Sequence, residues 1–465
     1  MDNQLFLLTY FPDENNRKVQ SGNRLIQNRG VSKMEQFFQL SKNRTDVKTE
    51  ILAGITTFLA MMYVIVVNPA ILKDAGMSFS AVLTATVMVS AFSSIAMGIY
   101  AKTPIALAPG MGINAFFTYG IVIGMGVSWE TALGAVFWSG IIFILLSVFN
   151  IRTYIVHAIP KQLRYAVAAG IGLFITLIGL KQSGFIAPNP ATMVGFGGFN
   201  AVTVTFVAGL AATSVLIVKN RKGAMVIGIV LTTLIAIPIG RYWGGDVPQV
   251  VYKGVFAAPD FSLLFKLDLI GSLKLAMVPV IFTLLFTDMF DSISTFIGVA
   301  EAADLLDEDG EPKNVKECLI VDSISTTISG LFGTSSGTSY IESAAGVEQG
   351  GRSGLTAVVA GLLFLPFMFC SPLLSVVPAV ATAPILVLVG AFMMKPVAKI
   401  NWDSMDDAIP AFLSIILIPM TYSITQGIVW GFLSWTLIKL LEGKRGDLSV
   451  TLIIIDILAI LALVI

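Results

Sequence analysis

Hydrophobic segments of about 20 residues recur along the whole chain, and this recurrence constrains the fold more than any other feature. A helix of that length spans the apolar interior of a lipid bilayer. Charged residues make up only 12% of the 465 residues, whereas soluble domains carry about 25%. The sequence therefore predicts an all-α, polytopic protein embedded in a lipid bilayer.

The hydrophobicity predicts fourteen membrane spans. Fourteen divides into two halves of seven, and because seven is odd, the second half enters the membrane in the opposite orientation to the first. Such 7+7 inverted repeats are typical of secondary transporters. A further apolar tail, 448–465, contains Asp456 and is expected to associate with the membrane. The predicted spans lie at about residues 49–67, 80–100, 104–122, 129–149, 163–181, 199–218, 223–241, 272–298, 314–332, 335–350, 354–371, 376–394, 405–422 and 423–441.

Positive charges in the short loops indicate the orientation. When the N-terminus is placed in the cytoplasm, the inside loops receive basic groups such as Arg152, Lys161 and Arg164, as the positive-inside rule requires. The acidic connection 299–313 then becomes a solvated cytoplasmic hairpin. We therefore expect a multi-pass protein of the cell membrane with a cytoplasmic N-terminus.

Several function classes find no support in the composition. The net charge is zero, so no basic surface suggests nucleic acid as a partner. The single His157 falls in a basic loop, and Cys318 and Cys370 form no metal or disulfide pattern. We expect neither a metal nor a cofactor, and the absence of a nucleophile–base set argues against an enzyme.

Two predicted spans are interrupted by polar, glycine-rich sequence at corresponding positions in the two halves. In the third span, residues 103–114 place an extended piece and a Pro109-Gly110 break before a helical piece from about Ile113. In the tenth, residues 333–338 precede a helical piece that begins at about residue 340. Interrupted spans at matching positions indicate the binding site in such transporters.

The half-helices of these two spans would direct free N–H groups and partial positive charge at a common point. Gly110 and Gly112 would let a ligand approach the backbone closely, although helix packing is an alternative reason for glycines in a span. Asn114 and Glu342 fall in the first turns of the two half-helices, and Thr338 and Ser339 precede Glu342.

The eighth predicted span carries two carboxylates. Asp288 and Asp291 are three residues apart and therefore share one helix face. Both cannot ionise cheaply in apolar surroundings, so one is expected to hold a proton near neutral pH, as a proton-coupled carrier requires. Alternatively, one of them caps a broken helix or accepts hydrogen bonds from backbone N–H groups. Asp322 in the ninth span fits a structural hydrogen bond between helices.

Carboxylates, an amide and aromatic rings together fit a nucleobase, whose edge presents N–H donors. Phe58 could stack on such a flat ligand or pack in the core. Exchange of simple cations is an alternative, as is a channel or receptor without coupled transport. An anion would require a cation, and Lys and Arg occur only near the span ends. The candidate substrate-binding residues are Glu342, Asp288, Gly110, Gly112, Asn114, Phe58, Ser339 and Thr338, and the candidate proton-coupling residues are Asp288, Asp291 and Glu342.

Several motifs between about residues 34 and 441 are similar to those of one known family. They are Thr-Glu-Ile-Leu-Ala-Gly-Ile-Thr-Thr-Phe at 49–58 with Val-Asn-Pro at 67–69, Ala-Pro-Gly-Met-Gly-Ile-Asn-Ala-Phe-Phe at 108–117, Phe-Asp-Ser at 290–292, Gly-Thr-Ser-Ser-Gly-Thr-Ser-Tyr-Ile-Glu-Ser-Ala-Ala-Gly at 333–346, and Gly-Gly-Arg-Ser-Gly-Leu-Thr at 350–356. The chain resembles the purine permeases of the azaguanine-resistance-like branch of the nucleobase:cation symporter-2 group.

The resemblance implies proton-coupled uptake of adenine, guanine or hypoxanthine, with a core domain that moves against a gate domain in an elevator-like manner. It implies that Asp288 and Glu342 hold the base and that Asp291, Gly110 and Gly112 are functionally important. A homodimer is a further expectation. The implied division is an N-terminal extension at 1–46, core domain at 47–150 and 246–371, gate domain at 151–245 and 372–445, and an apolar tail at 446–465.

The chain departs from the family pattern at two places. The eighth span of the family commonly reads Phe-Asp-Thr-x-Gly-Thr, whereas here residues 290–295 read Phe-Asp-Ser-Ile-Ser-Thr. Ser294 therefore adds a hydroxyl beside the expected site. Ala60 stands where Thr is usual. The preferred purine does not follow from the resemblance.

Overall fold

The computed structural model describes residues 33–149, 159–243, 250–303 and 312–444, with residues 305, 446, 448–449, 452–453, 455–457 and 459–460. Residues 1–32 of the predicted extension, His157, residues 304 and 306–311 of the acidic connection and much of the tail lie outside the described residues. Asp456 is described, is buried and accepts a hydrogen bond of 2.6 Å from Thr436.

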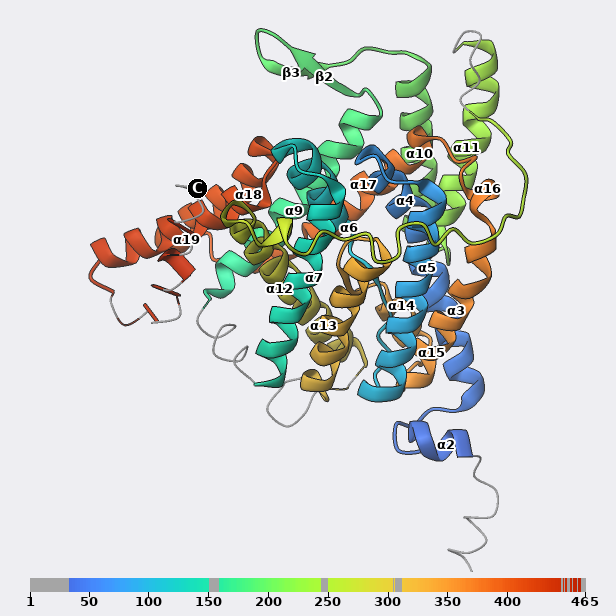
Figure 1. Cartoon of the computed structure of the whole chain (residues 1–465), viewed down its shortest axis with the longest axis horizontal. Coiled ribbons are helices and arrows are strands. Elements are labelled where there is room, and N and C mark those ends of the chain that lie inside the picture. The colour runs from blue at the N-terminus through green and yellow to red at the C-terminus, as the bar shows by residue number, and fades with distance from the viewer. Residues whose placement is uncertain are drawn as a thin grey trace, which may run out of the picture.

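Helices make up most of the described chain (Figure 1). The first half contains α2 (Lys33–Phe38), α3 (Val47–Met61), α4 (Val64–Asp74), α5 (Phe79–Ala96), η1 (Met97–Ala101), α6 (Met111–Ala115), η2 (Phe116–Ile123), α7 (Trp129–Val148), α9 (Lys161–Gln182), α10 (Ala201–Val218) and α11 (Ala224–Tyr242). The second half contains α12 (Val278–Ala303), α13 (Val315–Phe332), α14 (Ser343–Glu348), α15 (Gly354–Phe364), α16 (Ser371–Leu374), α17 (Ala379–Met393), α18 (Met405–Thr421) and α19 (Ile424–Leu441). Short turns of helix, η3 to η6, lie at Gly271–Leu273, Leu275–Met277, Leu365–Phe369 and Lys395–Lys399.

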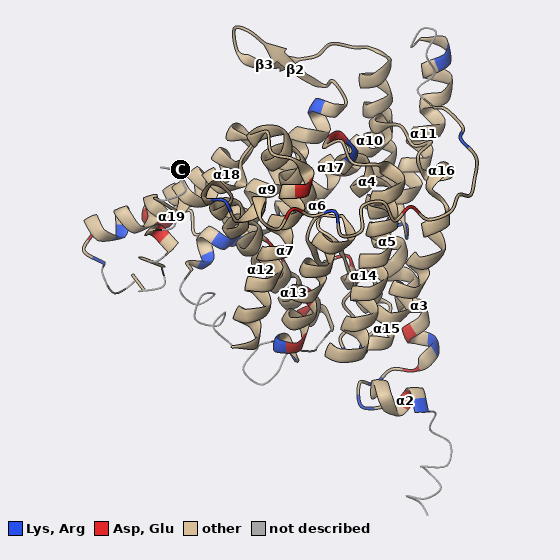
Figure 2. Ribbon diagram, viewed as in Figure 1, with Lys and Arg blue, Asp and Glu red and all other residues tan. Residues whose placement is uncertain are grey.

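Nine helical segments among the described residues are long and apolar enough to cross a membrane. Large apolar side chains also face outward along them: Phe92 is 54% exposed, Leu145 51% and Leu234 55%. Apolar side chains that would be unfavourable in water are stable against lipid. Lys, Arg, Asp and Glu occur mainly at helix ends and in connections (Figure 2). The chain is therefore a multi-pass membrane protein.

The first membrane-spanning segment is longer than the sequence predicts. The sequence places the end of the first span at Asn68-Pro69, whereas the helix continues through Pro69 to Asp74. Membrane helices tolerate proline when neighbouring groups satisfy the freed backbone. The direction changes earlier, at Met62 and Tyr63, where α3 gives way to α4. This change brings the Tyr63 side chain into the interior of the molecule, where it is 1% exposed.

The helices pack in two groups. In one group α13 packs on α7, α15 packs on α3 and α5, and α4 packs on α5. In the other, α17 and α18 pack on α9, α18 packs on α19, and α10 packs on α11. Helix α10 is peripheral, because only 33% of its apolar stretch is buried inside the molecule. The corresponding share is 72% for the segment Phe79–Ala101. Contacts such as α6 with α9 and α12 with α19 join the two groups.

Two connections have structure that the hydrophobicity does not predict. Between α9 and α10, β2 (Ile186–Asn189) and β3 (Met193–Phe196) form an antiparallel hairpin at the end of the molecule opposite α2 (Figure 1). Before α12, an extended segment lies across helix ends and is held by backbone hydrogen bonds from Phe265 to Leu331 and from Asp268 to Glu130, of 2.8 and 2.9 Å.

Candidate functional site

Two short strands cross in the interior of the molecule, one from each half of the chain. Strand β1 (Leu107–Pro109) pairs antiparallel with β4 (Gly337–Ser339), with Ala108 opposite Thr338. The Tyr340 N–H donates to Ala106 O and the Gly110 N–H to Ser336 O, both at 3.0 Å. All residues of both strands are buried. Because each strand supplies the partners of the other, non-helical backbone is stable at this depth.

A helix follows each strand and leads away from the crossing. Helix α6 begins at Met111, directly after β1, and continues as η2 to Ile123. After β4 the chain turns, and α14 begins at Ser343 with Glu342 at its N-cap. These starts differ by two or three residues from those predicted near Ile113 and residue 340. The two polar stretches that the sequence singled out thus contact each other directly.

A cavity of about 100 Å³ lies where these strands and helices meet α4, α9, α12 and α17. It is much smaller than the roughly 300–1,000 Å³ of pockets for drug-sized ligands, so it suits a compact ligand. Six predicted residues line it: Gly110, Gly112, Asp291, Thr338, Ser339 and Glu342. Other lining side chains include Tyr63, Arg164, Thr287, Phe290, Ser294, Tyr340 and Met393.

Glu342 is held by an aromatic hydroxyl. The Tyr63 hydroxyl donates to Glu342 Oε1 at 2.7 Å. Tyr340 donates its hydroxyl to Pro109 O at 2.5 Å, so its ring is fixed beside the crossing. The Tyr63 and Tyr340 ring centroids are 6.5 Å apart. Glu342 and Asp291 are partly exposed, and both face the cavity.

Three predicted substrate-binding residues do not line the cavity. Asp288 is 1% exposed and accepts from the Thr326 hydroxyl on α13 through Oδ2, and its Oδ1 has no partner among the described residues. Asn114 is buried and accepts from the Ser335 hydroxyl. Phe58 packs against the rings of Phe364 and Phe367 in the core, with centroids 5.0 and 5.6 Å away.

Asp322 is also buried, and the hydrogen bond predicted for it is not formed. Neither carboxylate oxygen is within hydrogen-bonding geometry of another described residue. Three hydroxyls lie between this region and the cavity, with Ser292 within 2.8 Å of Thr338 and Thr326 within 3.0 Å of Gly337 O. The structure therefore places Asp288 and Asp322 behind the cavity wall rather than on its surface.

Gly110 and Gly112 occupy positions without room for a side chain. A Cβ added to Gly110 would lie 2.5 Å from Thr338 Cγ2, and one added to Gly112 would lie 2.5 Å from Ile171 Cγ2. These contacts are closer than carbon atoms approach in proteins. Gly110 is required by the neighbouring strand, and Gly112 by the close approach of α6 to α9.

Arg164 is a cavity residue that the sequence analysis did not place there. It lies in the first turn of α9, at the start of the predicted fifth span, and the same analysis assigned it to an inside loop. Its position at a span end resembles that of the lysines and arginines in loops, so the sequence does not indicate that Arg164 lines the cavity. Tyr63 follows the break after α3, which the sequence also does not indicate. Among the described residues, no group of His, Cys, Asp and Glu side chains is arranged to hold a metal ion.

Comparisons with known proteins agree with one another on the kind of protein. Residues 48–430 match the model of a family described as the Permease family. The chain is 42% identical to the adenine permease AdeP of Escherichia coli (strain K12), over 94% of this chain and 97% of that protein. It is 40% identical to the guanine/hypoxanthine permease PbuO of Bacillus subtilis (strain 168), over 91% and 98%.

A solved structure shows a similar fold. The transmembrane domain of the cyanobacterial bicarbonate transporter BicA superposes with a TM-score of 0.63 over 83% of this chain and 97% of that chain. The two share 16% sequence identity, so this likeness describes the fold alone.

Proposed function

The chain belongs to the permease family that residues 48–430 match, and from this premise we propose that it is a secondary transporter that imports purine nucleobases by proton symport. The observation that carries the proposal is the small cavity at the strand crossing, where the Glu342 and Asp291 carboxylates face aromatic rings. The names of the relatives, an adenine permease and a guanine/hypoxanthine permease, support a purine as substrate.

Glu342 is the proposed anchor for the base. A carboxylate accepts hydrogen bonds from ring and exocyclic N–H groups, which purines present on their edges. Tyr63 already holds Oε1 at 2.7 Å, so the carboxylate is positioned at the cavity wall before the ligand binds, which lowers the entropic cost of binding. Phe290, Tyr63 and Tyr340 supply rings along a flat ligand. Ser294 adds a hydroxyl to the same wall and is a candidate determinant of which purine binds.

Asp291 and Glu342 are the proposed sites of proton coupling at the cavity surface. Two carboxylates facing one small space repel each other when both are charged. In the proposed cycle, a proton enters with the base and neutralises one of them. Asp288 contacts Thr326, which also contacts the backbone of β4, so its proposed role is to transmit the protonation state to the strand crossing.

The proposed movement is that of a core domain (47–150 and 246–371) against a gate domain (151–245 and 372–445). This proposal includes fourteen spans arranged as a 7+7 inverted repeat with a cytoplasmic N-terminus. The cavity supports it, because α4, α6 and α12 line one side while α9 and α17 line the other through residues such as Ile171 and Met393. A ligand bound between two domains becomes accessible first from one side of the membrane and then from the other when one domain moves against the other.

Uptake of radiolabelled adenine and hypoxanthine into proteoliposomes tests the proposal. We expect saturable uptake that rises when the outside is made more acidic and stops when the pH gradient is collapsed. Competition with guanine, xanthine and uracil ranks the substrates. Uptake that is indifferent to the pH gradient would refute proton coupling, and uptake of none of these bases would refute the substrate class.

A second candidate is a carrier for another small solute, including an anion. Arg164 at the cavity favours it, because a guanidinium is the usual partner of carboxylate and phosphate groups. The facing carboxylates of Asp291 and Glu342 oppose an anion, so purine transport is favoured. Uptake of radiolabelled bicarbonate or sulfate, together with uptake of none of the bases, would reverse this order.

A further inference from the structure

The cavity at the strand crossing is exposed toward one end of the molecule. The C-terminal part of α12 lies near the turn that follows α2, so α12 runs toward the α2 end. Among its cavity residues, Thr287 and Phe290 are 3% and 7% exposed, whereas Ser294, one turn further on, is exposed. Ile341, which also lines the cavity, is 48% exposed. The described residues therefore leave the cavity open toward the α2 end.

At the opposite end, helix α9 closes the cavity by packing against α6. Helix α9 ends at Gln182, shortly before the hairpin that lies opposite α2 (Figure 1). Ile171 lines the cavity, but the side chains that follow it toward Gln182 do not. Phe174 and Ile175 are fully buried, and Ile178 is 2% exposed. These apolar side chains separate the cavity from the end of the molecule opposite α2.

Outside this apolar layer, a chain of hydrogen bonds joins α9 to η2 and α4. The Gln182 amide donates through Nε2 to the Tyr119 hydroxyl at 2.7 Å, and the Tyr119 hydroxyl donates to Asp74 Oδ2 at 2.6 Å. Gln182 Nε2 also lies 3.4 Å from the same oxygen. Gln182 is the last residue of α9, Tyr119 lies on η2, and Asp74 ends α4. Because one partner is a carboxylate, the bond from Tyr119 is of the stronger, charge-assisted kind.

The turn between α18 and α19 lies against the same residues. Tyr422 in this turn has a left-handed backbone (φ +54°), and its ring packs on that of Phe174 with centroids 5.6 Å apart. Lys181 Nζ lies 5.3 Å from the centroid of the Tyr422 ring. A Cβ added to Gly120, next to Tyr119, would lie 3.5 Å from Tyr422 O. The end of α9 and this turn therefore form one surface against which η2 packs.

We propose that Asp74, Tyr119 and Gln182 form a latch that keeps the transport site closed at the end opposite α2 and opens in each transport cycle. The inference rests on the proposed function, because Asp74 and Tyr119 belong to the proposed core domain and Gln182 to the proposed gate domain. Movement of one domain against the other breaks the hydrogen bond between Gln182 and Tyr119. Asp74 is exposed and the other two side chains are partly exposed, so water replaces the lost partners. The latch therefore favours the closed state without preventing its opening.

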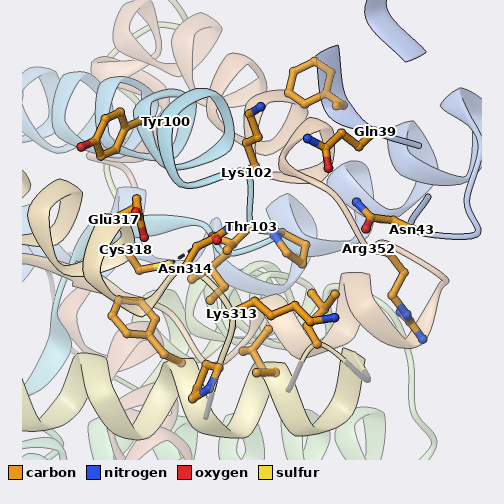
Figure 3. A pocket seen from close by; sticks show the side chains of 18 of the residues that line it. Gln39, Asn43, Tyr100, Lys102, Thr103, Lys313, Asn314, Glu317, Cys318 and Arg352 are labelled. Atoms are coloured by element: carbon orange, nitrogen blue, oxygen red, sulfur yellow. Dashed lines mark hydrogen bonds between the residues drawn. The ribbon is translucent and has the colours of Figure 1, made fainter. Parts of the chain in front are cut away.

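The contacts at the α2 end are of a different kind. Thr103, after η1, and Cys318, on α13, lie side by side with Oγ1 and Sγ 3.6 Å apart (Figure 3). Both belong to the proposed core domain, so their contact persists when the domains move. Lys222 of the proposed gate domain donates to Gln349 of the core domain at 2.6 Å, and both side chains are exposed. None of these four residues lines the cavity at the strand crossing, so these contacts do not close it at the α2 end.

Labelling of a cysteine in the cavity with a membrane-impermeant maleimide tests the latch without any substrate. Ser294→Cys is the reporter, because Ser294 lines the cavity and is exposed. The two cysteines of the chain are replaced by Cys318→Ser and Cys370→Ser. Labelling rates are measured in intact cells and in inside-out membrane vesicles, which present opposite faces of the membrane to the reagent. With a cytoplasmic N-terminus, we expect fast labelling in vesicles and slow labelling in cells when the latch is intact.

The test variants are Tyr119→Phe, which removes the central hydroxyl of the latch, and Gln182→Leu. We expect each to raise the labelling rate in cells by at least about fivefold, because the loss of one such hydrogen bond shifts an equilibrium by about that factor. The double variant should match the single variants, since both changes break the same network. The matched control is Tyr252→Phe, which removes a hydroxyl from a side chain that is 69% exposed on the connection before α12 and should label like the intact latch.

Loosening of the fold is distinguished from opening of the latch by the buried Cys318, which is 2% exposed. In proteins that retain Cys318 and carry Cys370→Ser without the reporter, its labelling in detergent should be equally slow with and without the test substitutions. Faster labelling of Cys318 in the test variants would attribute the effect to a looser fold and overturn the proposal.

Three further outcomes would overturn the latch. They are fast labelling of the reporter in both cells and vesicles with the latch intact, test variants that label like the intact latch, and an equal increase in the Tyr252→Phe control. Purine uptake by the same proteins tests the proposed function separately. The expected labelling pattern without uptake of any base would refute purine transport and support the latch. The expected pattern with cells and vesicles exchanged would support the latch and place the N-terminus outside the cell.

Discussion

Glu50 joins two motifs that are 300 residues apart, and its replacement gives a sharp test of the packing. It lies in the first turn of α3 and is fully buried. Its Oε1 accepts from the Arg352 N–H at 2.8 Å. Its Oε2 accepts from the N–H groups of Ser353 and Thr356 at 3.3 and 3.2 Å and from the Thr356 hydroxyl at 2.6 Å. A carboxylate of one helix therefore caps the N-terminus of another, α15.

The cost of Glu50→Ala follows from the donors that it would leave unpaired. The first N–H groups of a helix have no partner within it. Two backbone N–H groups, those of Arg352 and Ser353, would lose their acceptor, whereas the Thr356 N–H keeps Ser353 O at 3.3 Å; each buried unsatisfied donor costs about 1–3 kcal/mol. Because Arg352 is partly exposed and water can reach it, we expect a loss near the lower end, about 3 kcal/mol in total. Glu50→Gln keeps one oxygen acceptor and should lose about half as much.

Thermal unfolding of the purified protein in detergent measures this effect. A loss of about 3 kcal/mol should lower the apparent Tm by on the order of 5 °C, given roughly 2–4 °C per kcal/mol for domains of 150–250 residues and less for longer chains. Glu348→Gln is the matched control, because Glu348 is exposed at the end of α14 in the same region. We expect the apparent Tm to be highest for the wild type, lower for Glu50→Gln and lowest for Glu50→Ala, and the control to have the Tm of the wild type. A Glu50→Ala protein with the same apparent Tm as the wild type would refute the capping role of Glu50.

Two further predictions concern the cavity at the strand crossing. Tyr63→Phe removes the hydroxyl that donates to Glu342 and should weaken purine binding about tenfold, since hydrogen bonds to charged groups contribute about 1.5–3 kcal/mol. Equal KM values for uptake by the variant and the wild type would contradict the role of Tyr63 in positioning Glu342. Gly110→Val places a side chain against Thr338 and narrows the cavity, so it should abolish uptake. The protein should still reach the membrane, because overpacking costs only about 1–3 kcal/mol. Normal uptake by this variant would show that the purine site lies elsewhere.

Periodicity and composition predict the parts of this structure that depend on local sequence. The apolar segments predict a multi-pass membrane protein, and the two polar interruptions predict the stretches that form the strand crossing. Glu342 follows from the cost of an ionisable group at membrane depth. Each of these inferences requires only a short window of sequence.

Properties that depend on packing between distant segments are not predictable in this way. Asp288 and Asp291 share a helix face, yet α13 covers Asp288 while Asp291 remains open to the cavity. Spacing along one helix does not tell which neighbour lies on each side. The same holds for Arg164, which reaches the cavity from α9, and for Glu50, whose partners lie in α15.

Uptake by Glu342→Gln tests the proposed function most directly. The substitution keeps the size of the side chain but removes its charge and replaces one of the two carboxylate oxygens that could bind the base with an NH2 donor. Glu348→Gln makes the same change at an exposed position. Initial rates of radiolabelled adenine and hypoxanthine uptake would be compared at equal amounts of protein in proteoliposomes. We predict that Glu342→Gln lowers kcat/KM by at least about tenfold, the loss of one hydrogen bond to a charged group, and that the control transports like the wild type. Equal uptake by Glu342→Gln and the wild type would contradict the assignment of the cavity as the purine site.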